Sequence, residues 1–128
     1  MTDEPVAVKP RVLICDSNDD AILMLSKSPP FVDEYFTDVA FTGQQALDAL
    51  HTAHYDYAIL EVQYTDTSID KFLLGLSLVP NLPRIIFLTE QRGPAVDEAA
   101  KQFRAVVLKK PATIAEILGA FEATQRAP

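Results

Sequence analysis

Four short apolar runs most constrain what this sequence can fold into. Each run is apolar at four consecutive positions, which is too short for a helix and typical of a strand buried on both faces of a parallel sheet. A weaker, alternating segment over residues 35–40 fits an edge strand. The four buried runs are Val12-Leu-Ile-Cys15, Tyr57-Ala-Ile-Leu60, Ile85-Ile-Phe-Leu88 and Ala105-Val-Val-Leu108.

Helical patterns lie between these runs. Two of them start at apparent capping boxes, Thr42-Gly-Gln-Gln45 and Thr113-Ile-Ala-Glu116, in which a hydroxyl and the residue three positions later satisfy free backbone amides. The first helix must end early, because Pro29-Pro30 follows it. Helices are also predicted over residues 19–27, over residues 68–78 and from Pro94 onward.

The alternation of strands and helices predicts an α/β fold, a three-layer sandwich with a five-stranded parallel sheet between two layers of helices. A chain of 128 residues is long enough for one well-buried core and too short for two ordinary domains. We therefore expect one domain over residues 1–128, with residues 1–9 and 124–128 as flexible ends.

Charge and hydropathy exclude two kinds of partner. A formal net charge of −7 would repel a phosphate backbone, so direct nucleic-acid binding is not expected. No apolar stretch approaches the roughly 18 residues of a membrane span, and the acidic amino-terminal segment is unlike a signal peptide. We therefore expect a cytoplasmic protein that does not contact a membrane.

Polar residues follow the predicted strands at the point where each strand ends. Because ligands bind at the carboxyl ends of the strands in open parallel sheets, these side chains should converge on one small site. The residues concerned are Asp16 and Ser17 after the first strand, Glu61 after the third, Thr89 after the fourth, and Lys109, Lys110 and Pro111 after the fifth.

From Arg11 to about Thr124 the chain resembles the receiver domain of bacterial response regulators, the flavodoxin-like, chemotaxis-type domain of two-component systems. The resemblance is carried by the order and spacing of Val12-Leu-Ile-Cys-Asp16, Thr42-Gly-Gln-Gln-Ala-Leu47, Asp56-Tyr-Ala-Ile-Leu-Glu61, Pro83-Arg-Ile-Ile-Phe-Leu-Thr89 and Leu108-Lys-Lys-Pro111. It implies the strand order 2-1-3-4-5, and a site where an aspartate accepts a phosphoryl group from a histidine kinase with magnesium bound.

The resemblance also implies roles for individual residues. Asp16 matches one of two acidic residues that hold magnesium, Thr89 matches the hydroxyl residue that turns toward the phosphoryl group, and Lys110 matches the lysine that pairs with it. Pro111 matches the proline after that lysine, whose preceding peptide bond is usually cis in the family.

Two residues of the site depart from the family. Glu61 stands where the phosphate-accepting aspartate is expected, and Ser17 stands where the second acidic metal ligand is expected. Magnesium prefers carboxylate and water oxygens, so a site made of Asp16 and Glu61 should bind it weakly or not at all. Asp19 is an alternative acidic ligand if the loop is shifted. No cofactor is therefore expected to be required.

Glu61 is also one methylene longer than aspartate, which should spoil in-line attack in a preorganised site. The longer side chain instead places a fixed negative group facing Lys110, and Thr89 as a second candidate contact. Glu61 is thus interpreted as an incomplete, built-in phosphate mimic, because a carboxylate carries less charge and fewer oxygens than a phosphoryl group.

The output side departs from the family as well. Val107 occupies the position of the family's switch aromatic, and the usual Pro and Gly are absent from the loop over residues 63–69. A small branched residue has no ring to swing between rotamers, so signal-dependent repacking is not expected. The face of the fourth helix, fifth strand and fifth helix remains available for a signalling protein, an effector domain or a homodimer.

The leading hypothesis is a pseudo-receiver, a non-enzymatic signalling domain that acts by phosphorylation-independent protein interaction. The first alternative is an atypical receiver that accepts phosphate at Glu61 or at Asp66, which lies on the following loop. The second is a flavodoxin-like cofactor-binding protein, although acidic residues after the first strand would repel a flavin phosphate.

Overall fold

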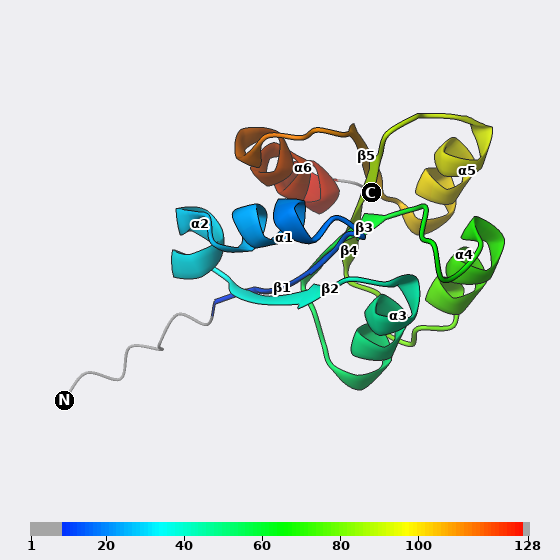
Figure 1. The fold of residues 1–128 in the computed structure, drawn as a ribbon, viewed down its shortest axis with the longest axis horizontal. Helices are drawn as coiled ribbons and strands as arrows, with labels where there is room; N and C mark the ends of the chain where they lie inside the picture. Colours follow the sequence, from blue (N-terminus) through cyan, green and yellow to red (C-terminus); the bar gives the residue numbers. More distant parts are fainter. Residues whose placement is uncertain (1–8, 127–128) are drawn as a thin grey trace.

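A computed structural model describes residues 9–126 of the chain. These residues form a sheet of five strands with six helices around it (Figure 1). The strands are β1 (Arg11–Cys15), β2 (Phe36–Ala40), β3 (Tyr57–Glu61), β4 (Arg84–Thr89) and β5 (Val106–Lys109). The helices are α1 (Asp19–Ser26), α2 (Pro29–Asp33), α3 (Gly43–Thr52), α4 (Ile69–Ser77), α5 (Pro94–Phe103) and α6 (Ile114–Arg126).

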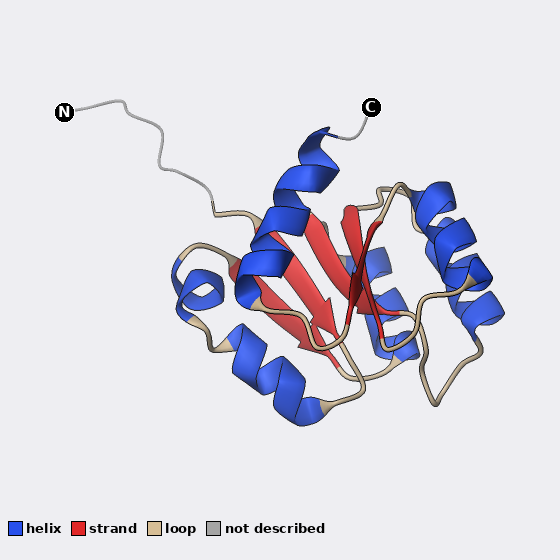
Figure 2. Ribbon diagram, turned by 90° about the horizontal axis from the view of Figure 1, so that it is seen from above, coloured by secondary structure: helices blue, strands red, loops and turns tan. Residues whose placement is uncertain are grey.

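The strands are all parallel and lie in the order β2-β1-β3-β4-β5. Helices cover both faces of this sheet, as the view from above shows (Figure 2). The predicted fold class and strand order are therefore confirmed. The segment expected to be an edge strand is β2, which lies at one end of the sheet.

Each central strand contributes to two separate cores because successive side chains point to opposite faces of the sheet. Leu13 and Leu60 face the core beneath α3, α4 and α5, whereas Ile14 and Ile59 face the core beneath α1, α2 and α6. All four side chains are almost completely buried. This double burial explains why the strands are apolar at consecutive positions.

The predicted helix starts are visible as hydrogen bonds. Thr113 and Glu116 form a complete capping box, with Glu116 N donating to Thr113 Oγ1 and Thr113 N donating to Glu116 Oε1. At α3, Thr42 Oγ1 accepts from Gln45 N, but the Gln45 amide oxygen accepts from Phe41 N. The box predicted at α3 is therefore displaced by one residue, because the Gln45 side chain accepts from the amide of Phe41 and not from that of Thr42.

Two expectations about helices need correction. Pro29 and Pro30 do more than end the first helix, because they occupy the first turn of the short helix α2, where their missing amides cost no hydrogen bond. At the other end, α6 continues to Arg126, and Thr124 is buried with its hydroxyl donating to Phe121 O. Residues 124–126 are thus helical, while the ends at 1–8 and 127–128 lie outside the described residues.

Across residues 9–126 no helix has both the length and the apolar character that would let it traverse a lipid bilayer.

Candidate functional site at the carboxyl edge of the sheet

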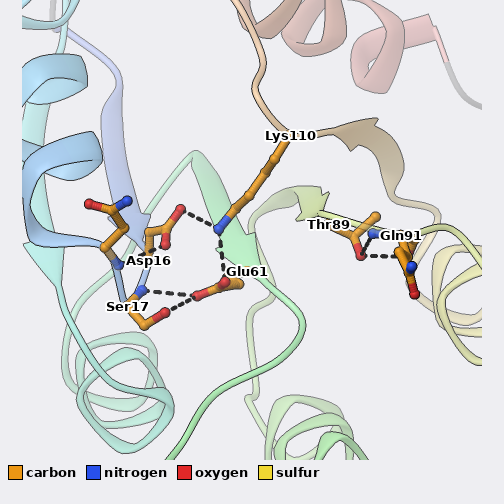
Figure 3. Close-up of polar contacts among 7 residues, drawn as sticks. Asp16, Ser17, Glu61, Thr89, Gln91 and Lys110 are labelled. Carbon is orange, nitrogen blue, oxygen red and sulfur yellow. Dashed lines mark hydrogen bonds and ion pairs between the residues drawn. The ribbon is translucent and has the colours of Figure 1, made fainter.

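Four polar residues from three strand ends meet at the carboxyl edge of the sheet. Asp16 and Ser17 follow β1, Glu61 is the last residue of β3, and Lys110 follows β5 (Figure 3). The ammonium of Lys110 lies between two carboxylates, 2.7 Å from Asp16 Oδ2 and 2.8 Å from Glu61 Oε1. The convergence predicted from strand ends is therefore present for these residues.

The second carboxylate oxygen of Glu61 is bound from the β1 side. Glu61 Oε2 accepts hydrogen bonds from Ser17 N at 2.9 Å and from Ser17 Oγ at 2.8 Å. Asp16 is held in a similar way, because its Oδ1 accepts from Asn18 N at 2.9 Å while its Oδ2 faces Lys110. Every carboxylate oxygen of the cluster thus has a donor.

Burial makes this pairing necessary. The side chains of Lys110, Asp16 and Glu61 are only 16%, 6% and 12% exposed, and an unpaired charge at such a position is costly. Burial alone raises the pKa of Glu61, but the hydrogen bonds from Lys110 and Ser17 together outweigh it, so the pKa lies below its ordinary 4.5. Burial lowers the pKa of Lys110, but Asp16 and Glu61 more than compensate, so that pKa is raised. Glu61 and Lys110 are therefore both charged at neutral pH.

The lowered pKa of Glu61 predicts a pH dependence of folding. A carboxyl whose folded pKa is depressed contributes stability that is present above its unfolded pKa and is lost as the pH falls through its folded pKa. We expect the free energy of unfolding to fall as the pH drops below about 4.5. In Glu61→Gln this part of the dependence should disappear, as measured by urea unfolding at several pH values between 6 and about 3. An unchanged profile in the variant would contradict the assignment.

Thr89 does not join the cluster, which corrects the expectation that it faces Glu61 or Lys110. Thr89 is buried at the end of β4, but its hydroxyl donates to Gln91 O at 2.7 Å and accepts from Gln91 N at 3.3 Å. Figure 3 shows Thr89 and Gln91 apart from the charged cluster. Its side-chain hydroxyl closes a local turn within the β4–α5 loop, which is a common use of threonine at a strand end.

Asp66 also lies away from the cluster, at the start of α3. Its two carboxylate oxygens accept from Gly43 N and Gln44 N at 2.9 and 3.0 Å. The hydrogen bond from the amide of Gln44 is the largest cause that lowers the pKa of this exposed carboxyl, and the amide of Gly43 adds to it, while desolvation acts in the opposite direction. Asp66 thus caps a helix and ties the β3–α4 loop to it.

The remaining predicted positions lie on and after β5. Val107 is half-buried and packs against the core beneath α5, beside Phe87 in the strand register. Lys109 is exposed and does not join the cluster, whereas Lys110 is the lysine that points inward. The Lys110–Pro111 peptide bond is cis, and Pro111 lines the cavity next to the cluster.

For a metal ion, the arrangement offers few free ligands. Asp16 and Glu61 share one ammonium, and Ser17 contributes a hydroxyl that already donates to Glu61. Within residues 9–126, no group of three or more His, Cys, Asp or Glu side chains is placed to hold a metal. The Asp19 alternative cannot be placed, because that side chain lies outside the described part of the chain.

Reasoning from the sequence missed two features of the site. One is the backbone amide of Ser17 as a donor to Glu61, since every residue except proline has such an amide and no residue type marks it. The other is a cavity beside the cluster, lined partly by Ile22 and Leu25 of α1. Apolar residues at helical spacing indicate a buried face and do not reveal a gap beneath it.

Comparisons with known proteins place this fold. No protein-family model matches the sequence, and no match was found among curated proteins. The structure is similar to the receiver domain of Francisella response regulator 1452 (TM-score 0.77, 21% identity, 91% of this chain and 96% of that one). It is also similar to the chemotaxis response regulator CheY4 of Vibrio cholerae (0.76, 21% identity, 91% and 99%) and to adenylate cyclase from Rhodopirellula baltica (0.76, 17% identity, 91% and 87%).

These likenesses define the class of fold. The chain matches receiver domains over nearly their whole length, in a five-stranded α/β arrangement of the flavodoxin-like kind. At about one identical residue in five, the likeness establishes the fold alone. What this particular chain does must therefore be argued from its own charged cluster.

Proposed function

We propose that the chain is a pseudo-receiver, a non-enzymatic signalling domain that binds a signalling protein or effector domain without being phosphorylated. One observation carries the proposal. At the position expected for the phosphate acceptor stands Glu61, whose two oxygens are held by Lys110 on one side and by Ser17 on the other. The position is occupied by a permanent, paired anion.

Glu61 is a poor nucleophile for phosphoryl transfer in this setting. Both oxygens are hydrogen bonded, and the extra methylene moves the carboxylate by about 1.5 Å relative to aspartate. An error of that size is enough to spoil in-line attack at a preorganised site. The other proposed acceptor, Asp66, is used as a helix cap, which counts against it as well.

The mimicry of a phosphoryl group is partial. Lys110 is engaged as the resemblance implies, but Thr89 is bonded to Gln91 and the switch position holds Val107. Thr89 and Val107 therefore do not couple the charge at Glu61 to the domain surface, as the corresponding residues of a switching receiver are expected to do. The domain therefore presents one constant surface to its partner.

The surface chemistry limits where a partner can dock. We expected a partner or homodimer on the face that is now seen as α5, β5 and α6. The exposed large apolar side chains of the described residues lie elsewhere, so docking on that face would depend on polar contacts. The exposed large apolar residues are Met24, Val32, Phe36, Val39, Leu74, Leu78 and Leu82.

We propose further that magnesium binds weakly and is not required. The residues present do not fit a tight magnesium site, because the ammonium of Lys110 occupies the space between the two carboxylates and Ser17 supplies only a hydroxyl. No step of the proposed function passes through the metal.

The direct test is phosphoryl uptake. The intact chain, incubated with acetyl phosphate and magnesium, should show no added phosphoryl mass by mass spectrometry. The double variant Glu61→Asp/Ser17→Asp shortens the acceptor and restores the second acid, so it should take up phosphate if the pocket is otherwise competent.

The outcomes are separable by variant. Uptake by the unchanged chain would overturn the pseudo-receiver and favour an atypical receiver. Loss of that uptake in Glu61→Gln or in Asp66→Asn would then identify the acceptor.

A further inference from the structure

A cavity of about 570 Å³ opens beside the charged cluster, between α1 and α6. Its volume lies within the roughly 300–1,000 Å³ of small-molecule sites. The proposed function uses Asp16, Ser17, Glu61 and Lys110 at one end of this cavity, but it leaves the rest of the cavity without a role.

Most of the cavity is apolar. Ile14 and Leu88 contribute from the sheet, Ile22 and Leu25 from α1, and Ile117 from α6. Walls from three separate elements, with polar groups gathered at one end, are the arrangement that binds an amphipathic small molecule. The apolar end would hold its body, and the polar end would fix its head group.

The charge of the polar end of the cavity determines which sign of charge the ligand's head group should carry. Asp16, Glu61 and Glu90 supply three carboxylates against the single ammonium of Lys110, which leaves a formal excess of two negative charges. Glu90 directly follows β4, is exposed, and is in none of the ion pairs seen among residues 9–126. An anionic head would meet three acids, whereas a cationic head would meet one lysine that is already paired.

From this geometry we infer that the cavity binds a small amphipathic amine, with its apolar body between α1 and α6 and its ammonium group toward Glu90. The inference does not depend on the pseudo-receiver proposal, because it concerns a neighbouring space and a carboxylate outside the cluster. A bare metal ion would not use the apolar walls, so the ligand must carry a hydrocarbon part.

The experiment uses three probes of equal chain length on the 128-residue protein. Hexylammonium chloride, sodium hexanoate and 1-hexanol are titrated separately at pH 7 and constant ionic strength, and amide chemical shifts are followed by NMR. Hexylammonium should give saturable shifts at Leu25, Ala112 and Ile117, while hexanoate and hexanol should bind more weakly, by about fivefold if the ion pair reaches the upper range for an exposed pair. Magnesium chloride alone should not reproduce the shifts at these apolar residues.

Matched variants separate the head-group contact from a general effect of charge. Glu90→Gln should weaken hexylammonium binding by about fivefold, the upper range for an exposed ion pair. Glu98→Gln changes an acid on α5 that is also exposed but does not line the cavity, so it should leave binding unchanged. Leu25→Trp, which fills the cavity from α1, should abolish binding, with the melting temperature checking that the variant folds.

Three results would overturn the inference. They are the absence of saturable hexylammonium binding, hexanoate binding that equals or exceeds it, and equal losses in Glu90→Gln and Glu98→Gln. Since Glu90 is exposed, its variant should fold normally, and the test stands even if Leu25→Trp does not fold.

Discussion

Replacing Lys110 by Met should lower the free energy of unfolding by about 3 kcal/mol or more, as expected when one partner of a buried ion pair is removed. The ammonium is the contact that Asp16 and Glu61 share. Without it, two buried carboxylates would face each other, held only by Ser17 and the amide of Asn18. Urea unfolding at pH 7 measures the loss.

Lys109 provides the matched control. It is the neighbouring residue, has the same side chain and is exposed, so Lys109→Met should change the free energy of unfolding by less than about 0.5 kcal/mol. If the free energy of unfolding falls by the same small amount in both variants, the ammonium of Lys110 does not neutralise the cluster.

Lys110→Met should also respond to magnesium. Removal of the ammonium leaves Asp16 and Glu61 free to share a divalent ion, so magnesium chloride should raise the melting temperature of the variant above that in sodium chloride of equal ionic strength. The unchanged chain should show little such difference. A magnesium effect of the same size in both proteins would contradict the proposal that Lys110 displaces the metal.

Replacing Phe121 by Ala should destabilise the protein by about 3–5 kcal/mol, the usual cost of truncating a buried aromatic side chain. Phe121 is 3% exposed on α6 and stacks on Tyr57 with ring centroids 4.2 Å apart. Phe121 also makes T-shaped contacts with Phe31 and Tyr35, so one side chain joins α6 to β3, to α2 and to the segment before β2. Truncation would leave a cavity among these rings.

Phe36→Ala serves as the control for Phe121→Ala. It removes the same side chain from an edge strand, where the residue is 56% exposed, and should cost less than about 1 kcal/mol. Chemical unfolding of both variants at pH 7 measures the difference. Similar losses would mean that the ring cluster around Phe121 is not packed as described.

Much of the fold could be predicted from hydrophobic pattern alone, for a physical reason. Strands buried on both faces leave consecutive apolar residues such as Ile59 and Leu60, in runs that are shorter than an ordinary helix. The polar residues at the ends of those strands could be predicted to converge because parallel strands all end at one edge. Asp16, Glu61 and Lys110 follow this rule.

The remaining features depend on choices that the residue type does not determine. Thr89 stands at the expected strand end, but its hydroxyl can rotate toward the pocket or toward its own loop, and it bonds to Gln91. Pro29 is compatible with ending one helix or starting another, and the structure shows it in the first turn of α2. The continuation of α6 depends on burial of Thr124, which a local pattern near a chain end does not predict.

The pairing of Glu61 with Lys110 also has a consequence in time. A phosphorylated aspartate is temporary, because hydrolysis removes its charge and restores the resting protein. A glutamate belongs to the covalent chain, so no hydrolase can erase it and no donor has to renew it. If the negative charge of Glu61 provides the signal, a cell can change the amount of signal only by making or degrading copies of the protein. Expression level then takes the place of phosphorylation and hydrolysis.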